Sequence, residues 1–122
     1  MDEDSQQRLR IVVVGPCASG KTTLVIGLRA RGFARACLVA QEHSGVADLW
    51  KIHGRPDVLI CLDARGETIN ARLQRSDWTP GYLREQLQRL RGARAACDLY
   101  LPTDELTIAG VLERVLKFLS IT

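Results

Sequence analysis

One short segment of the sequence carries residue types that suit a polyphosphate ligand. It reads Gly15-Pro16-Cys17-Ala18-Ser19-Gly20-Lys21-Thr22, with Thr23 directly after it. The segment matches the pattern Gly-x-x-x-x-Gly-Lys-Ser/Thr at every defined position. Glycines let such a loop turn successive N–H groups toward an anion at close range. Lys21 supplies a mobile charge for the β- and γ-phosphates, and the Thr22 hydroxyl is a ligand for Mg²⁺. We therefore predict that residues 15–23 bind a nucleoside triphosphate, ATP or GTP, with Mg²⁺.

The residues on either side of this segment have the patterns that such a loop needs. Before it, Ile11-Val12-Val13-Val14 is a continuous β-branched run, as expected for a strand that is covered on both faces. After it, Leu24, Val25 and Leu28 recur at helical spacing, so a helix should begin at Lys21. The positive end of the dipole of that helix adds to the field at the loop.

Apolar runs and helical stripes alternate along the rest of the chain. Three more strands are expected at residues 36–40, 57–62 and 98–101. Helices are expected after Ser44, around Ile69, from the Thr79-Pro80 cap onward and after Thr107. This alternation indicates an α/β fold, a three-layer sandwich with a parallel sheet of four or five strands. We assign one domain to residues 9–122 and a flexible tail to residues 1–8.

Composition and charge limit the classes of protein to consider. The chain has 122 residues, of which 46% are hydrophobic and 25% charged, as in one globular domain. No apolar run approaches the roughly 18–20 residues of a membrane span, and the acidic N-terminus resembles neither a signal nor a transit peptide. We therefore expect a cytoplasmic protein without membrane contact. The net charge of +3 comes from scattered arginines, a pattern that favours a small anionic ligand over nucleic acid.

The four cysteines are far apart in the sequence. They form no Cys-x-x-Cys pair, and no histidine near them completes a zinc motif. We therefore expect reduced thiols, with neither a disulfide nor a zinc site. Cys17 differs from the others because it lies in the loop itself, where backbone N–H groups can activate a thiol. A tolerated filler residue is the simpler interpretation of this position.

The loop, with its flanking strand and helix, resembles that of the P-loop NTPase superfamily. Within that superfamily the chain resembles the small kinases, such as adenylate, shikimate and gluconate kinases. Residues 56–64 resemble a late strand of those kinases, and residues 97–107 resemble their closing strand, turn and helix cap. The resemblance implies a role for Arg72 and Arg75 as lid arginines that contact the phosphates. It also implies ATP or GTP and Mg²⁺ as cofactors. This chain departs from the family because the acceptor-binding insertion before Leu38 is absent.

Two acidic residues are candidates for the metal site that includes Thr22. Glu42 follows the second predicted strand and Asp63 ends the third, and the carboxyl ends of parallel strands face the ligand in this class of fold. Glu42 is the first choice, to hold Mg²⁺ or to orient an attacking water, and a solvated loop glutamate is the alternative. Asp63 can instead cap the next helix. The neighbouring His43 suits a general base or a γ-phosphate ligand, although a surface histidine is the commoner case.

Arg72 and Arg75 are three residues apart, so on one helix they would share a face and clamp one phosphate group. Solvated surface charges are the alternative. Trp78, in a polar loop, is the candidate for stacking on a base.

The leading hypothesis is a small kinase-like protein that transfers a phosphoryl group to an unknown small-molecule acceptor. Its catalytic residues would be Lys21, Glu42, Arg72 and Arg75, the arginines stabilising charge in the transition state. Two alternatives stay open: an NTPase whose acceptor is water, and a nucleotide sensor without catalysis. The sequence leaves the acceptor, the base and the oligomeric state undetermined.

Overall fold

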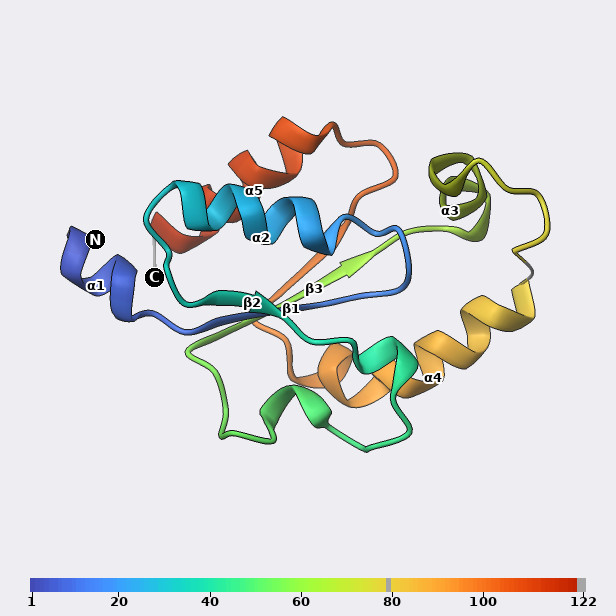
Figure 1. The fold of residues 1–122 in the computed structure, drawn as a ribbon, viewed down its shortest axis with the longest axis horizontal. Coiled ribbons are helices and arrows are strands. Elements are labelled where there is room, and N and C mark those ends of the chain that lie inside the picture. Colours follow the sequence, from blue (N-terminus) through green and yellow to red (C-terminus); the bar gives the residue numbers. More distant parts are fainter. Residues whose placement is uncertain (79, 121–122) are drawn as a thin grey trace.

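The computed structural model describes residues 1–78 and 80–120. A sheet of four parallel strands, in the order β2-β1-β3-β4, lies between helices (Figure 1). The strands are β1 (Ile11–Val14), β2 (Ala36–Leu38), β3 (Val58–Asp63) and β4 (Leu99–Pro102). The α-helices are α1 (Glu3–Arg8), α2 (Lys21–Ala30), α3 (Gly66–Leu73), α4 (Pro80–Ala96) and α5 (Ile108–Ser120). Two 3-10 helices, η1 (Gln41–His43) and η2 (Leu49–Lys51), follow β2. The predicted α/β fold with a small parallel sheet is confirmed.

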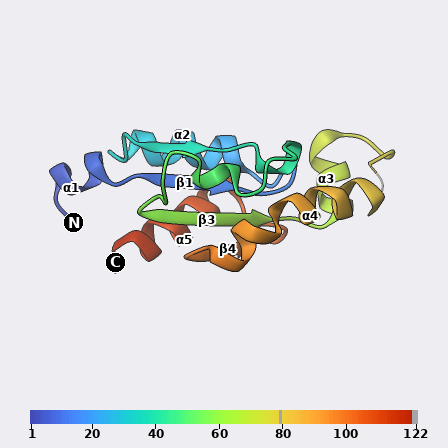
Figure 2. The same ribbon diagram turned by 90° about the horizontal axis from the view of Figure 1, so that it is seen from below.

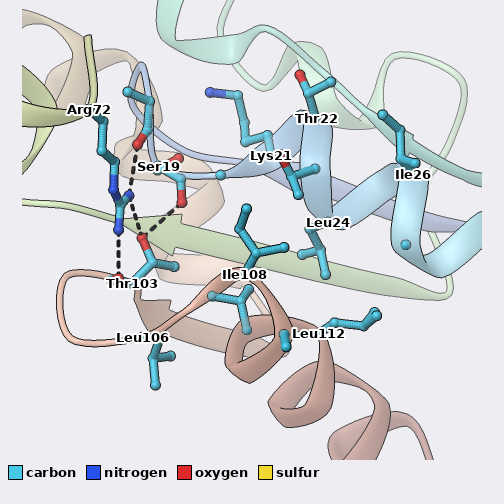
Figure 3. Close-up of a pocket in the computed structure, with 16 residues that line it drawn as sticks. Ser19, Lys21, Thr22, Leu24, Ile26, Arg72, Thr103, Leu106, Ile108 and Leu112 are labelled. Carbon is cyan, nitrogen blue, oxygen red and sulfur yellow. Dashed lines mark hydrogen bonds between the residues drawn. The ribbon is translucent and has the colours of Figure 1, made fainter. Parts of the chain in front are cut away.

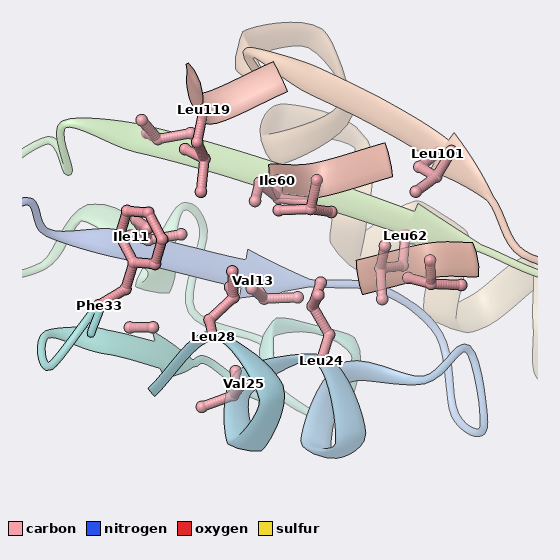
Figure 4. Close-up of a cluster of buried hydrophobic side chains, with 14 residues drawn as sticks. Ile11, Val13, Leu24, Val25, Leu28, Phe33, Ile60, Leu62, Leu101 and Leu119 are labelled. Atoms are coloured by element: carbon pink, nitrogen blue, oxygen red, sulfur yellow. The ribbon is translucent and has the colours of Figure 1, made fainter. Parts of the chain in front are cut away.

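Each face of the sheet is buried under its own set of helices. Ile11 and Val13 belong to an apolar cluster with α2 and α5 (Figure 4). Val12 and Val14 belong to a second cluster, on the opposite face, with α4 and Trp50. All four β1 side chains are fully buried, and each contributes roughly 1.5–3 kcal/mol by leaving water. The uninterrupted apolar run is therefore the consequence of helices on both faces.

All four strands point in one direction, so their carboxyl ends lie at one edge of the sheet. Figure 2 shows β1, β3 and β4 side by side, with α3 beyond the end of β3. The loops that leave β1, β2 and β3 therefore meet at this edge, which is where a ligand site is expected in parallel sheets.

The predicted N-terminal tail contains a short helix. The Asp2 carboxylate caps α1 by accepting a hydrogen bond from the Ser5 N–H at 2.8 Å. Glu3 and Asp4 stand in its first turn, where the helix dipole favours negative charge. None of the α1 residues is buried, so local capping rather than packing explains this helix.

The short helix predicted after Ser44 is a 3-10 helix that begins only at Leu49, so Ser44 does not cap it. This helix is η2, and the buried Trp50 is one of its residues. The Gln41 side chain donates to the Val46 carbonyl at 2.9 Å and accepts from the Trp50 N–H at 3.1 Å. These bonds satisfy backbone groups that a helix would have paired, so the segment closes as a loop around Gln41.

Other boundaries shift by a few residues. β4 begins after Asp98, because the Asp98 carboxylate accepts a hydrogen bond from the Leu59 N–H at 2.7 Å, beside the start of the strand ladder. The predicted cap at Thr107 is confirmed, since its hydroxyl accepts from the Gly110 N–H at 3.0 Å. The predicted cap at Thr79 lies outside the described residues. In the part of the chain that is described, no helix is both long and apolar enough to span a bilayer.

Candidate functional site

Residues 15–22, here named the glycine-rich loop, connect β1 to α2 at the carboxyl edge of the sheet. Gly20 has a φ of +106°, a conformation that side chains rarely adopt. A Cβ added at Gly15 would lie 2.7 Å from both the Leu62 carbonyl oxygen and Ser19 Oγ. Both glycines of the motif are therefore required by the backbone path and its close packing.

The Lys21 side chain folds back over the glycine-rich loop. Its Nζ donates hydrogen bonds to the carbonyls of Gly15 and Pro16, at 2.8 and 2.9 Å. It also forms an ion pair with Glu42 Oε2 at 2.7 Å. The side chains are only 10% and 4% exposed, so this is a buried ion pair. All three ammonium protons thus have acceptors, and the charge is held at the centre of the loop.

Glu42 reaches this position from η1, directly after β2. The backbone of η1 is held to α4 by Arg89, whose guanidinium donates to the Glu42 carbonyl at 3.1 Å. Within the described residues, Glu42 Oε1 and Ser19 Oγ are both buried and have no hydrogen-bond partner. A buried polar group without a partner costs about 1–3 kcal/mol. Each of these two groups therefore has bonding capacity that the described chain leaves unused.

A cavity of about 860 Å³ opens on the other side of the loop, between α2 and the start of α5 (Figure 3). The exposed residues Thr22 and Thr23 line it at the first turn of α2. Its far wall is apolar, with Ile26, Leu106 and Ile108 among the lining residues. The volume is in the range of small-molecule sites, which combine apolar walls with a few polar groups.

Arg72 extends from α3 to the glycine-rich loop. Its guanidinium donates to the Ala18 carbonyl at 2.8 Å and to the Thr103 hydroxyl and carbonyl oxygens at 3.0 and 2.7 Å (Figure 3). The Thr103 hydroxyl in turn donates to the Ser19 carbonyl at 2.8 Å. The arginine is therefore anchored beside the loop by backbone acceptors on two segments.

Arg75 has a different environment. The prediction that both arginines lie on one helical face is wrong, because α3 ends at Leu73 and Gln74 takes a left-handed conformation. Arg75 pairs instead with Asp77, at 2.8 Å and on the surface. Its contacts in the described chain are thus not with the glycine-rich loop.

The two candidate acids are also separated. Asp63 Oδ2 accepts hydrogen bonds from the Tyr100 hydroxyl and, at 3.4 Å, from Arg94. Its Oδ1 accepts from the adjacent Ala64 N–H, so Asp63 does not cap α3, which begins after Arg65. Burial, together with the hydrogen bond to Asp63, raises the pKa of Tyr100 to about 12. Asp63 thus belongs to a polar cluster with β4 and α4, whereas Glu42 reaches the loop.

Trp78 is not available for stacking. It is 8% exposed and packs with Ala64 and Ile69. Its backbone N–H and carbonyl are both bonded to the Asn70 side chain, which fixes the loop around it. The stacking role predicted for Trp78 is therefore wrong.

A second cluster lies on the side of the loop that faces η1. Cys17 Sγ and His43 Nε2 are 3.4 Å apart, and Glu42 Oε2 is 3.9 Å from the same nitrogen. Gln86 holds Cys17 from α4: it accepts from the Cys17 N–H at 3.0 Å and donates to Sγ at 3.1 Å. The fold therefore brings a histidine beside Cys17, although no sequence motif links the two residues.

Sequence reasoning missed Gln86 and Thr103. Gln86 shares a helical face with Leu83 and Leu90, three and four residues away, so a polar residue on the buried stripe of α4 was the available signal. For Thr103 the only sequence signal was its place in the turn after β4.

Neither a model of a known protein family nor a curated protein sequence matches this chain.

Proposed function

We propose that the glycine-rich loop binds the phosphates of a nucleoside triphosphate, ATP or GTP, with Mg²⁺. One observation carries this proposal: the first turn of α2 presents N–H groups without described side-chain acceptors, next to the Lys21 ammonium. Lys21 is its first residue, no acidic residue stands in the turn, and no described side chain caps its N–H groups. A cation at this end opposes the helix dipole, which favours anions there. Within the described residues, Glu42 offsets part of this positive field by pairing with Lys21, and a bound polyphosphate would neutralise the remainder.

The donors around the loop suit phosphate oxygens. The Ser19 hydroxyl is buried without a partner, and the N–H groups of the first turn of α2 are directed toward the loop. Lys21 would exchange a carbonyl or the Glu42 carboxylate for a phosphate oxygen. The nucleoside would occupy the cavity of about 860 Å³, with its base against the apolar wall that includes Ile108.

The oxygen groups also suit Mg²⁺, a hard cation that prefers carboxylate, hydroxyl, water and phosphate ligands. The Thr22 hydroxyl is exposed at the loop, and Glu42 Oε1 is buried and unpartnered, so both are available. Asp63 fits this role less well, because its carboxylate is bonded to Tyr100 and Arg94. Bound Mg²⁺ would neutralise phosphate charge.

We further propose slow phosphoryl transfer, in a kinase-like reaction or with water as acceptor. Arg72 already lies against the loop, and a short shift from the Ala18 carbonyl would bring it to a phosphoryl oxygen. Positive charge there stabilises the transition state more than the bound substrate. Glu42 and His43 lie side by side and could orient a water. A nucleotide sensor without turnover is the alternative.

Binding can be tested with a variant that separates affinity from folding. Ser19→Ala removes a buried hydroxyl without a partner, so stability should be unchanged or higher while affinity for ATP-Mg²⁺ falls. Calorimetry with ATP and with GTP measures the affinity, and Lys51→Ala, on the surface, is the matched control for a Lys21→Ala variant. Release of label from γ-labelled ATP, with and without a metabolite extract, identifies the acceptor. If the folded wild-type protein binds neither nucleotide, the proposal is refuted.

A further inference from the structure

Three side chains with metal-binding atoms converge beside the glycine-rich loop, on the side that faces η1. Cys17 supplies a thiol from the loop, and Glu42 and His43 supply a carboxylate and an imidazole from η1. One ligand atom from each lies within 4.8 Å of the others. The first is separated from the other two by more than twenty residues, so only the fold brings them together.

The distances between these atoms are close to those of a tetrahedral zinc site. Zinc bonds of about 2.0–2.3 Å place neighbouring ligand atoms about 3.3–3.6 Å apart. Cys17 Sγ and His43 Nε2 are 3.4 Å apart, which needs no adjustment. His43 Nε2 and Glu42 Oε2 are 3.9 Å apart, and the His43 side chain is 58% exposed, so a small rotation closes this gap.

A second observation points to a ligand at this cluster. The Glu42 residue is only 3% exposed, and its Oε1 has no hydrogen-bond partner within residues 1–78 and 80–120. Oε2, the carboxylate oxygen measured against His43, is also paired with Lys21, whereas Oε1 leaves the same carboxylate with unused bonding capacity. The Gln86 amide donates to Cys17 Sγ at 3.1 Å, a contact that orients the sulfur toward the cluster.

We propose that Cys17, Glu42 and His43 bind Zn²⁺, with the thiolate, one carboxylate oxygen and Nε2 as ligands. Sulfur and imidazole ligands select zinc over the hard cation Mg²⁺. The thiol proton passes to solvent when the metal binds, and the fourth coordination position is left for water or a phosphate oxygen. The exposed His43 ring gives the metal a path of entry. The site shares Glu42 with the proposed Mg²⁺ site, whereas Cys17 has no part in the proposed nucleotide chemistry.

The test uses Co²⁺ alone as a spectroscopic probe for the zinc site in the full chain, without nucleotide. A thiolate ligand gives a sulfur-to-cobalt charge-transfer band, and addition of Zn²⁺ should remove the band by displacement. Cys17→Ser should abolish it. His43→Ala, at an exposed position, should weaken Co²⁺ binding by more than about tenfold, with an unchanged melting temperature. Because the readout needs no nucleotide, its failure is distinct from failure of the proposed nucleotide binding.

Matched controls are Cys37→Ser and His53→Ala, which change the same residue types away from the cluster. Both should keep the band and the affinity of the wild-type protein. The proposal is overturned if wild-type protein shows no charge-transfer band, if the band survives Cys17→Ser, or if His43→Ala binds Co²⁺ as tightly as wild type.

Discussion

The buried ion pair between Lys21 and Glu42 predicts that Lys21 contributes to the stability of the fold. In Lys21→Ala, the Glu42 carboxylate, whose side chain is 4% exposed, would lose its 2.7 Å ion pair and keep among the described residues the longer contact of Oε2 with His43 Nε2 at 3.9 Å. Removing one partner of a buried ion pair lowers the free energy of unfolding by about 3–5 kcal/mol. Little solvent screening applies at this exposure, so the full range is expected. For a domain of this size, that cost lowers Tm by about 10–20 °C.

A double-mutant cycle separates the loss of the pair from other effects of the substitution. Glu42→Gln removes the charge but keeps a carbonyl oxygen for the Lys21 ammonium. It should therefore lower the free energy of unfolding by only about 1–2 kcal/mol. The double variant leaves no buried charge, and we expect it to be more stable than Lys21→Ala alone. The coupling energy should therefore favour the pair by about 1–3 kcal/mol.

Urea denaturation followed by circular dichroism measures all four proteins at one pH. Lys51→Ala serves as the control, because Lys51 is half exposed and its contact with Asp48 is on the surface, so its unfolding midpoint should match the wild type. The reasoning is refuted if Lys21→Ala is as stable as wild type, or if the double variant is less stable than Lys21→Ala.

The remaining predictions concern three other parts of the fold. Arg72→Ala should lower the rate of ATP loss at saturating ATP by roughly 10³-fold or more, whereas Arg75→Ala should leave it nearly unchanged; equal effects would contradict the placement of the two side chains. Gly15→Ala should lower stability by about 1–3 kcal/mol in chemical denaturation, because its Cβ meets a backbone carbonyl, while Gly45→Ala, in open space, should not. In an alkaline absorbance titration, one of the two tyrosines should ionise with a pKa of about 12, and Tyr100→Phe should remove that step. In the unfolded chain this tyrosine ionises from about pH 10, so the free energy of unfolding should fall as the pH rises from 10 to 12. The fall should be smaller in Tyr100→Phe. An identical fall in wild type and Tyr100→Phe would refute the raised pKa of Tyr100.

Local patterns in the sequence were sufficient for the sheet and the glycine-rich loop. The run from Ile11 to Val14 predicts a strand covered on both faces, and the motif after it predicts a turn followed by a helix at Lys21. Each of these features depends on neighbouring residues and on the conformations that glycine and β-branched residues prefer. They were therefore visible without knowledge of distant contacts.

The choice between equivalent candidates required the tertiary structure. Glu42 follows β2 and Asp63 ends β3, yet of the two only Glu42 lies against Lys21, because η1 packs beside the loop. Arg72 reaches the loop and Arg75 does not, because the helix ends between them. Sequence periodicity places helix ends poorly, so this difference was not predictable.

The missed residues act across long stretches of chain. Gln86 contacts Cys17 at a sequence separation of 69, and Thr103 contacts Ser19 at a separation of 84. No local pattern encodes such pairs, because each depends on how whole helices and strands pack together. The sequence alone therefore determined the glycine-rich loop and the strand and helix that flank it. The packing of α4, η1 and the turn after β4 decided which side chains surround the loop. The same packing brought Cys17, Glu42 and His43 together.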